Sequence, residues 1–131
     1  MSGSLVIVGA HPAEVTAALG LDPDRAWVAG ERNTFHLPSG DIRELASVSE
    51  RSGWKKFSPD DLVEPEQIVE YWVEFVRLRV SAFLTLPAAT TASIEVLIQE
   101  NQGLDITPED LATLSSARVG LGITVQVMSD G

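Results

Sequence analysis

Hydrophobic and polar positions follow a clear helical period between Pro65 and Val80. On a helical wheel at about 100° per residue, large apolar side chains gather on one side and charged ones on the other. The apolar side holds Ile68, Trp72, Phe75, Val76 and Phe83, and the charged side holds Glu66, Glu70, Glu74 and Arg77. Two large aromatic rings on one helix face require a broad apolar surface beneath them. We therefore expect the rest of the chain to supply a sheet of at least four strands that buries Ile68, Trp72, Phe75 and Val76.

Short apolar or alternating runs elsewhere predict the strands of that sheet. They lie at Leu5–Val8, Arg25–Ala29, Glu44–Ser49 and Thr90–Gln99, and at the period-two run formed by Ile123, Val125 and Val127. The predicted sheet core consists of Leu5, Ile7, Trp27, Ile94, Val96, Ile98, Val125 and Val127. Residues 30–43 hold glycine, proline, serine and asparagine at close intervals, which favours a loop with a short extended piece at Thr34–Leu37.

Two shorter helices are predicted at proline-led starts. His11-Pro12 opens one that continues over Ala13–Leu19, and Thr107-Pro108 opens another that runs to about Ala117. Each helix lies between two strands, so a β-α-β unit stands on either side of the central helix. The resulting order, β-α-β-β-α-β-α-β, predicts an α+β fold. Its expected architecture is a two-layer sandwich in the ferredoxin-like style, with the helices on one face of a mostly antiparallel sheet.

Composition and charge narrow the classes of function. The length of 131 residues and the 44% hydrophobic content fit one domain over residues 1–131. The absence of cysteine excludes disulfides and thiolate metal sites. A net charge of −10 disfavours nucleic acid and anionic membrane surfaces as partners. The N-terminal residues lack the pattern of a signal peptide, so a soluble cytoplasmic protein is the expectation.

Acidic residues cluster on and just before the central helix. The cluster consists of Asp60, Asp61, Glu64, Glu66, Glu70 and Glu74, with no Lys or Arg between its ends. Such a row fits a solvated face, a contact surface for a basic protein partner, or carboxylates that share a divalent cation. Of the functional interpretations we favour the protein partner, because a rigid helix holds the row in place and its charge steers a basic protein toward it.

No catalytic or cofactor-binding pattern is present. The chain has neither a Walker sequence nor G-x-G-x-x-G, and Ser39 and Ser58 have no histidine neighbour. His11 could act as a general base, but its place before Pro12 favours a capping role at the helix start. We therefore predict a non-catalytic protein without a cofactor.

The alternative hypothesis is a small-ligand site formed by the loop 30–43 and an exposed tryptophan. Trp54 is the candidate for exposure, because Lys55 and Lys56 follow it directly. A pocket lined by Trp54, Phe35 and His36 would support this hypothesis.

Several segments resemble a bacterial family known as domain of unknown function 4279. They are the opening strand, the helix ending in Leu19-Gly20-Leu21, Pro23, the run Trp27-Val28-Ala29-Gly30-Glu31, Trp54, Ser58–Leu62, and Ile106–Leu111 before the last strand. The resemblance covers nearly the whole chain, and it transfers no catalytic residues. It implies a small acidic α+β domain of a kind in which some members are suspected to be immunity proteins of bacterial toxin systems.

Overall fold

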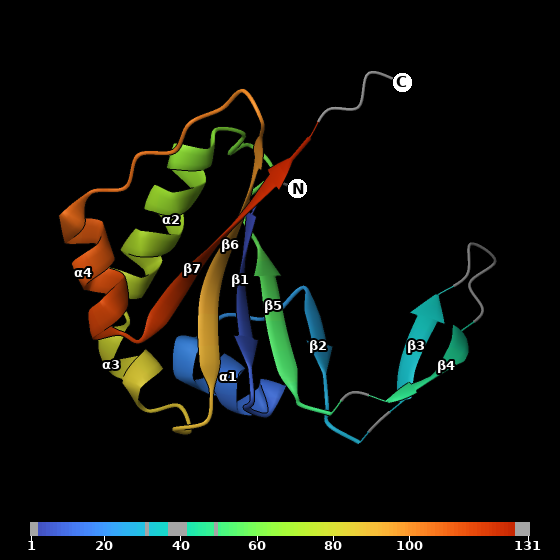
Figure 1. Cartoon of the computed structure of the whole chain (residues 1–131). Helices are drawn as coiled ribbons and strands as arrows, with labels where there is room; N and C mark the ends of the chain where they lie inside the picture. The colour runs from blue at the N-terminus through green and yellow to red at the C-terminus, as the bar shows by residue number, and fades with distance from the viewer. Residues whose placement is uncertain (1–2, 31, 37–41, 49, 128–131) are drawn as a thin grey trace.

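The computed structural model describes residues 3–30, 32–36, 42–48 and 50–127, and for residues 32–36 and 42–48 it describes the backbone alone. The chain forms an α+β fold with a mixed sheet of five strands (Figure 1). Over the described residues the elements are β1 (Gly3–Val8), α1 (Pro12–Leu19), β2 (Arg25–Trp27), β3 (Arg32–His36), β4 (Ile42–Val48), β5 (Gly53–Phe57), α2 (Pro65–Arg77), α3 (Val80–Leu84), β6 (Thr91–Gln99), α4 (Pro108–Ser116) and β7 (Val119–Gln126).

The main sheet has the order β2-β5-β1-β6-β7. β1 lies at its centre and runs antiparallel to β5 on one side and to β6 on the other. β2 is antiparallel to β5 at one edge, and β7 is parallel to β6 at the other. Both predicted β-α-β units are present, and β5 separates the strands of the first one. β3 and β4 form a two-stranded antiparallel sheet of their own.

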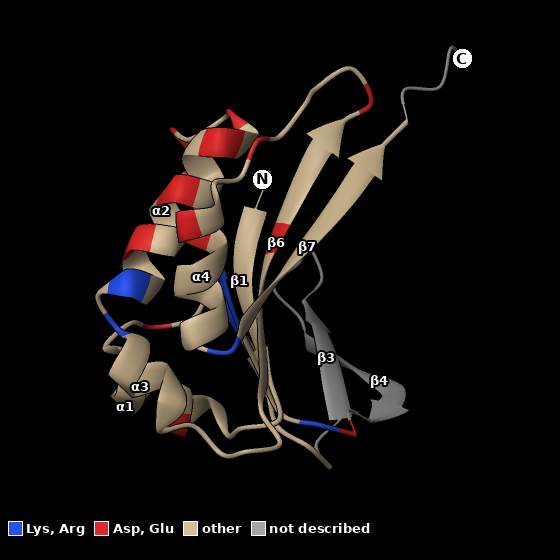
Figure 2. Cartoon of the chain, turned by 60° about the vertical axis from the view of Figure 1, so that its left-hand side comes forward, with Lys and Arg blue, Asp and Glu red and all other residues tan. Residues whose placement is uncertain are grey.

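The helices lie on one side of this sheet in the view of Figure 2. α2 packs on β1 and β6, α4 packs on β7, and α1 packs on β5. The core between the layers includes Leu5 and Ile7 from β1 and Ile94, Val96 and Ile98 from β6. Ile68, Trp72, Phe75 and Val76 of α2 are buried against them, which confirms the predicted inner face of the central helix.

The central helix ends earlier than its sequence pattern predicts, at Arg77. Arg79 leaves the helical conformation, and its guanidinium carbon lies 3.9 Å from the centre of the Phe75 ring. Its Nε donates a hydrogen bond to the carbonyl of Leu19 at 3.1 Å. Phe83 therefore reaches the core from the separate helix α3. Arg79 can cover this part of the apolar face because its charged guanidinium group is hydrogen-bonded to a carbonyl oxygen.

Three residues of the predicted sheet core were assigned wrongly. Trp27 is only half-buried and pairs with Gly53 on the sheet face away from the helices. A Cβ atom at Gly53 would overlap the Trp27 ring, so the glycine makes room for the indole. Val125 is 53% exposed and Val127 is 70% exposed. Their period of two is real, but no helix covers this end of β7 in the described part of the chain.

The described structure contains more strands and helices than the predicted order β-α-β-β-α-β-α-β. Most of the predicted strand Glu44–Ser49 is present as β4, but it pairs with β3 in a separate sheet and not in the main one. β3 covers most of the extended piece expected within the loop 30–43, and α3 follows α2. Asp60 and Asp61 lie in a turn between β5 and α2. The segment from Trp54 to Phe57 belongs to β5, an interior strand of the main sheet. None of the described helices is long and apolar enough to cross a bilayer.

Candidate partner-binding surface

The acidic residues of α2 lie on its solvent side. Glu66, Glu70 and Glu74 follow one another at a spacing of four and are all exposed. Asp60, Asp61 and Glu64 precede the helix and are exposed as well. Figure 2 shows the acidic segments of α2 and of the turn before it on the outer side of the helix layer. The six residues predicted for partner binding are therefore accessible on one region of the surface, which we call the acidic face.

One basic side chain borders the acidic face at the C-terminal end of α2. Arg77 forms an ion pair with Glu74 of the same helix and lies 3.5 Å from a carboxylate oxygen of Asp110 in α4. Among the described side chains, neither Glu66 nor Glu70 forms an ion pair. Exposed ion pairs contribute little stability, about 0–1 kcal/mol. Arg77 thus offsets the charge of one end of the face and leaves the remainder uncompensated.

An apolar groove runs along α2 beside the acidic face. Its volume is about 520 Å³. It is lined by Leu62, Gln67, Glu70, Tyr71, Glu74, Phe75 and Leu78. Tyr71 is 39% exposed and Leu78 is 71% exposed. On the helical wheel both fall between the acidic row and Phe75, so Glu70 and Glu74 form one wall of the groove.

The sequence-based interpretation missed this groove. The outer half of the predicted helix 65–80 contains two apolar residues, Tyr71 and Leu78, which stand seven positions apart. Residues at this spacing lie on the same side of a helix, two turns apart. Their position beside the acidic row was therefore readable from the sequence.

The predicted exposure of Trp54 is wrong. Its side chain is fully buried, and its indole Nε1 donates a hydrogen bond to Thr16 Oγ1 at 3.2 Å. In β5 successive side chains point to opposite faces, so Trp54 enters the core while Lys55 faces out. A ligand platform on Trp54 is therefore excluded. The side chains of Phe35 and His36 lie outside the described residues.

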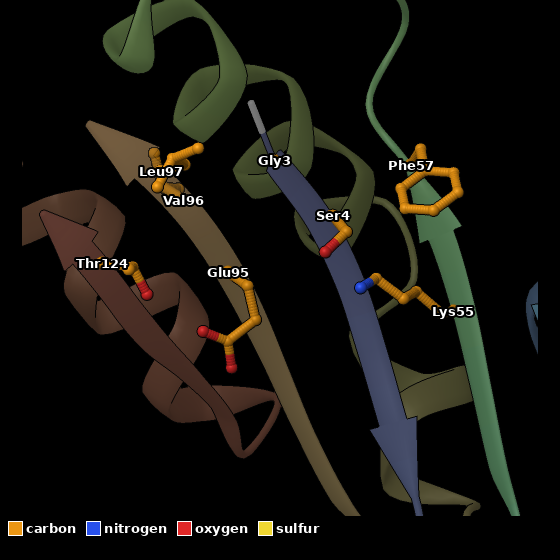
Figure 3. Close-up of a pocket in the computed structure, with 8 residues that line it drawn as sticks. All are labelled: Gly3, Ser4, Lys55, Phe57, Glu95, Val96, Leu97 and Thr124. Carbon is orange, nitrogen blue, oxygen red and sulfur yellow. The ribbon is translucent and has the colours of Figure 1, made fainter. Parts of the chain in front are cut away.

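A shallow pocket lies on the sheet face opposite the helices (Figure 3). Its volume is about 190 Å³, and it is lined by Gly3, Ser4, Lys55, Phe57, Glu95, Val96, Leu97 and Thr124. Lys55 and Glu95 project from the two strands that flank β1. The Lys55 Nζ lies 5.3 Å from the centre of the Phe57 ring, and Glu95 accepts a hydrogen bond from Ser93 Oγ at 2.8 Å. Both charged groups thus already have partners within the sheet.

His11 has the capping role that its position favours. Its Nδ1 accepts a hydrogen bond from the backbone N–H of Ala13 at 3.1 Å, and its side chain is exposed at the start of α1. Thr107 Oγ1 does the same for the N–H of Asp110 in α4. Within the described residues, no group of three or more His, Asp or Glu side chains is placed to hold a metal ion.

The comparisons with known proteins add no relative. No family model, no curated protein and no solved structure matches the chain.

Proposed function

We propose that this chain is a non-catalytic interaction domain of the immunity type that binds a basic protein through the acidic face and the groove of α2. The observation that carries the proposal is the apolar groove walled by Glu70 and Glu74. An apolar side chain of a partner would fill the groove while neighbouring Lys or Arg residues meet the carboxylates. Interfaces combine a desolvated apolar anchor with a charged rim in this way.

The rigidity of α2 supports this proposal. The opposite side of the helix is fixed by Ile68, Trp72 and Val76, each with no exposed surface. Trp72 also meets Phe75 edge to face, with ring centres 5.4 Å apart. A surface held in this way loses little conformational entropy on binding.

The charge of the whole chain supports a basic partner. The net charge of −10 raises the rate of encounter with a cationic protein and lowers it with nucleic acid. A cationic toxin domain, the partner class that the family resemblance implies, has the required chemistry.

The test is a capture experiment from the source organism with matched charge variants. One variant carries Glu66→Lys, Glu70→Lys and Glu74→Lys. The control carries Asp22→Lys, Glu50→Lys and Glu100→Lys, which changes the net charge equally at exposed positions away from α2. We expect a captured basic protein to be lost with the α2 variant, retained by the control and released by salt. A folded α2 variant that keeps every partner at unchanged affinity in low salt would overturn the proposal.

A second variant separates the groove from the charges. Leu78→Asp places a polar group in the groove at a position that is mostly exposed, so it should leave the fold intact. Leu84→Asp, at an exposed apolar position in α3 that is not part of the acidic face or the groove, is its control. Loss of the partner with Leu78→Asp alone would show that the groove takes an apolar anchor. Equal binding by both variants would limit the contact to the acidic face.

A further inference from the structure

The two edges of the main sheet differ in length and chemistry. β2 is a short edge of three residues, and Asp24 and Arg25 lie at its start. β7 is an edge of eight residues, and the stretch from Val119 to Val127 contains no charged residue and no proline. Its pairing with β6 continues in register from Val119 to Gln126 without a bulge. Natural proteins protect long edge strands with charge, proline or bulges, and this edge has none of these.

The direction of the free backbone groups follows from one hydrogen bond. The Gln126 carbonyl accepts from the N–H of Glu100, which continues β6, so Gln126 points toward β6. In a strand, the N–H and C=O of one residue point to one side and those of the next residue to the other. Leu121, Ile123 and Val125 therefore direct their N–H and C=O groups to the open edge. Among the described residues, no strand pairs with that side.

Apolar side chains accompany these backbone groups. Ile123, Val125 and Val127 are all exposed on the face that carries the helices. On the other face the same strand presents Gly120, Gly122, Thr124 and Gln126, which are uncharged. The edge thus offers hydrogen-bonding groups and an apolar strip together.

We infer that two copies of this chain associate by pairing β7 of one copy with β7 of the other. A two-fold axis perpendicular to the sheet places Ile123 opposite its own copy and Leu121 opposite Val125. Each pair would exchange both N–H···O bonds, because all three residues direct their backbone groups outward. β-Branched side chains would then meet across the junction, which is a favourable cross-strand pairing.

The distribution of charge on the chain favours a second copy over a basic protein as the partner of this edge. Two copies with a net charge of −10 repel each other, so contact is favoured where the surface carries no charge. The uncharged run of β7 provides such a place, and it attracts a cationic strand less than the acidic face does. In this arrangement the helix layers of both copies lie on one side of a continuous sheet, and both acidic faces stay free.

The test is analytical ultracentrifugation of the full chain over a range of protein concentrations. We expect a dimer of about twice the chain mass of 14.1 kDa. Val125→Lys places a charge on the edge and should weaken the dimer by at least about 10-fold in Kd. Val63→Lys, the same substitution at an exposed position before α2, should leave the Kd unchanged. Circular dichroism establishes that each variant is folded.

A second variant tests the backbone rather than the side chain. Ile123→Pro removes an N–H that points to the open edge and spares the hydrogen bonds to β6. We expect it to give a folded monomer. A wild-type chain that stays monomeric at the highest concentration tested would overturn the inference, as would equal dimer Kd values for Val125→Lys and Val63→Lys.

Salt separates this inference from the proposed function. Screening reduces repulsion between two acidic copies, so the dimer should be as tight or tighter when salt is raised, whereas a complex with a basic protein should weaken. A Val125→Lys monomer that still captures the basic partner would show that the α2 surface works without the β7 contact. A dimer that dissociates as salt is raised would contradict the inference.

Discussion

The indole N–H of Trp54 in β5 donates a hydrogen bond to Thr16 Oγ1 in α1, with 3.2 Å between the two atoms. The bond joins the first helix of the chain to a strand that arrives more than thirty residues later. Trp54 has no exposed surface, so its N–H relies on this hydroxyl in place of water. The pair holds α1 over the half of the sheet that α2 does not cover.

Thr16→Val should destabilise the protein by about 1–3 kcal/mol, because it leaves the buried N–H of Trp54 without an acceptor. Thr113→Val is the control, since Thr113 lies in α4 and, among the described residues, its hydroxyl donates to a carbonyl of its own helix. Urea denaturation of both variants measures the difference. Equal losses would mean that the effect comes from valine in a helix and that the hydrogen bond contributes little.

Trp72→Ala should destabilise the protein by about 3–5 kcal/mol, because it opens a cavity between α2 and the sheet. The neighbouring variant Tyr71→Ala should cost much less, since Tyr71 is partly exposed. Trp72→Phe should fall between wild type and Trp72→Ala, because the Trp72 Nε1 has no hydrogen-bond partner within the described residues and loses nothing on removal. Thermal and urea unfolding report all three. A Trp72→Ala loss below about 1 kcal/mol would contradict the burial of this face.

Gly53→Ala should destabilise the fold by about 1–3 kcal/mol, because the new methyl group would overlap the Trp27 ring. Gly120→Ala is the matched control in β7, where the nearest atoms lie 3.8 Å and 3.9 Å from the added carbon. Chemical denaturation of the two variants gives the comparison. Near-equal stabilities would show that Trp27 moves aside without cost.

His11→Ala should cost about 0.5–2 kcal/mol through loss of the cap on α1. His11→Asn should restore most of that stability, because asparagine also accepts a hydrogen bond from the first turn of a helix. Thr107→Ala provides the parallel measurement for α4. If His11→Ala unfolds at the wild-type temperature, the Nδ1 contact with Ala13 contributes nothing to stability.

Local rules of helix formation worked because they act within a few residues. The period of α2 and the proline-led starts at His11 and Thr107 each depend on nearby chain, so the sequence was sufficient to place these helices. The burial of Trp54 was not readable in this way. Two following lysines suggest exposure, but Lys55 faces outward, and Lys56 reaches Asp24 at 3.4 Å near the β2 edge.

The other wrong assignments concern residues whose burial depends on segments that are distant in the sequence. Val125 and Val127 alternate like core residues, and only the length of α4 decides whether a helix reaches over them. Trp27 is large and apolar, yet its face is set by its pairing with Gly53. Two groove residues, Tyr71 and Leu78, could be read from the helical pattern, but the groove is also lined by Leu62, which precedes the helix in the sequence.

The central place of β1 in the main sheet has a consequence for folding during synthesis on the ribosome. Leu5 pairs with Lys56 on one side and with Ile94 on the other. Of the described strands β1 precedes both of its partners, so one of its edges stays open until β5 is made and the other until β6 is made. A chain halted between β5 and β6 would still carry an apolar strand, β1, with one unpaired edge. During synthesis, this edge of β1 therefore stays available for pairing with other chains until the residues of β6 leave the exit tunnel.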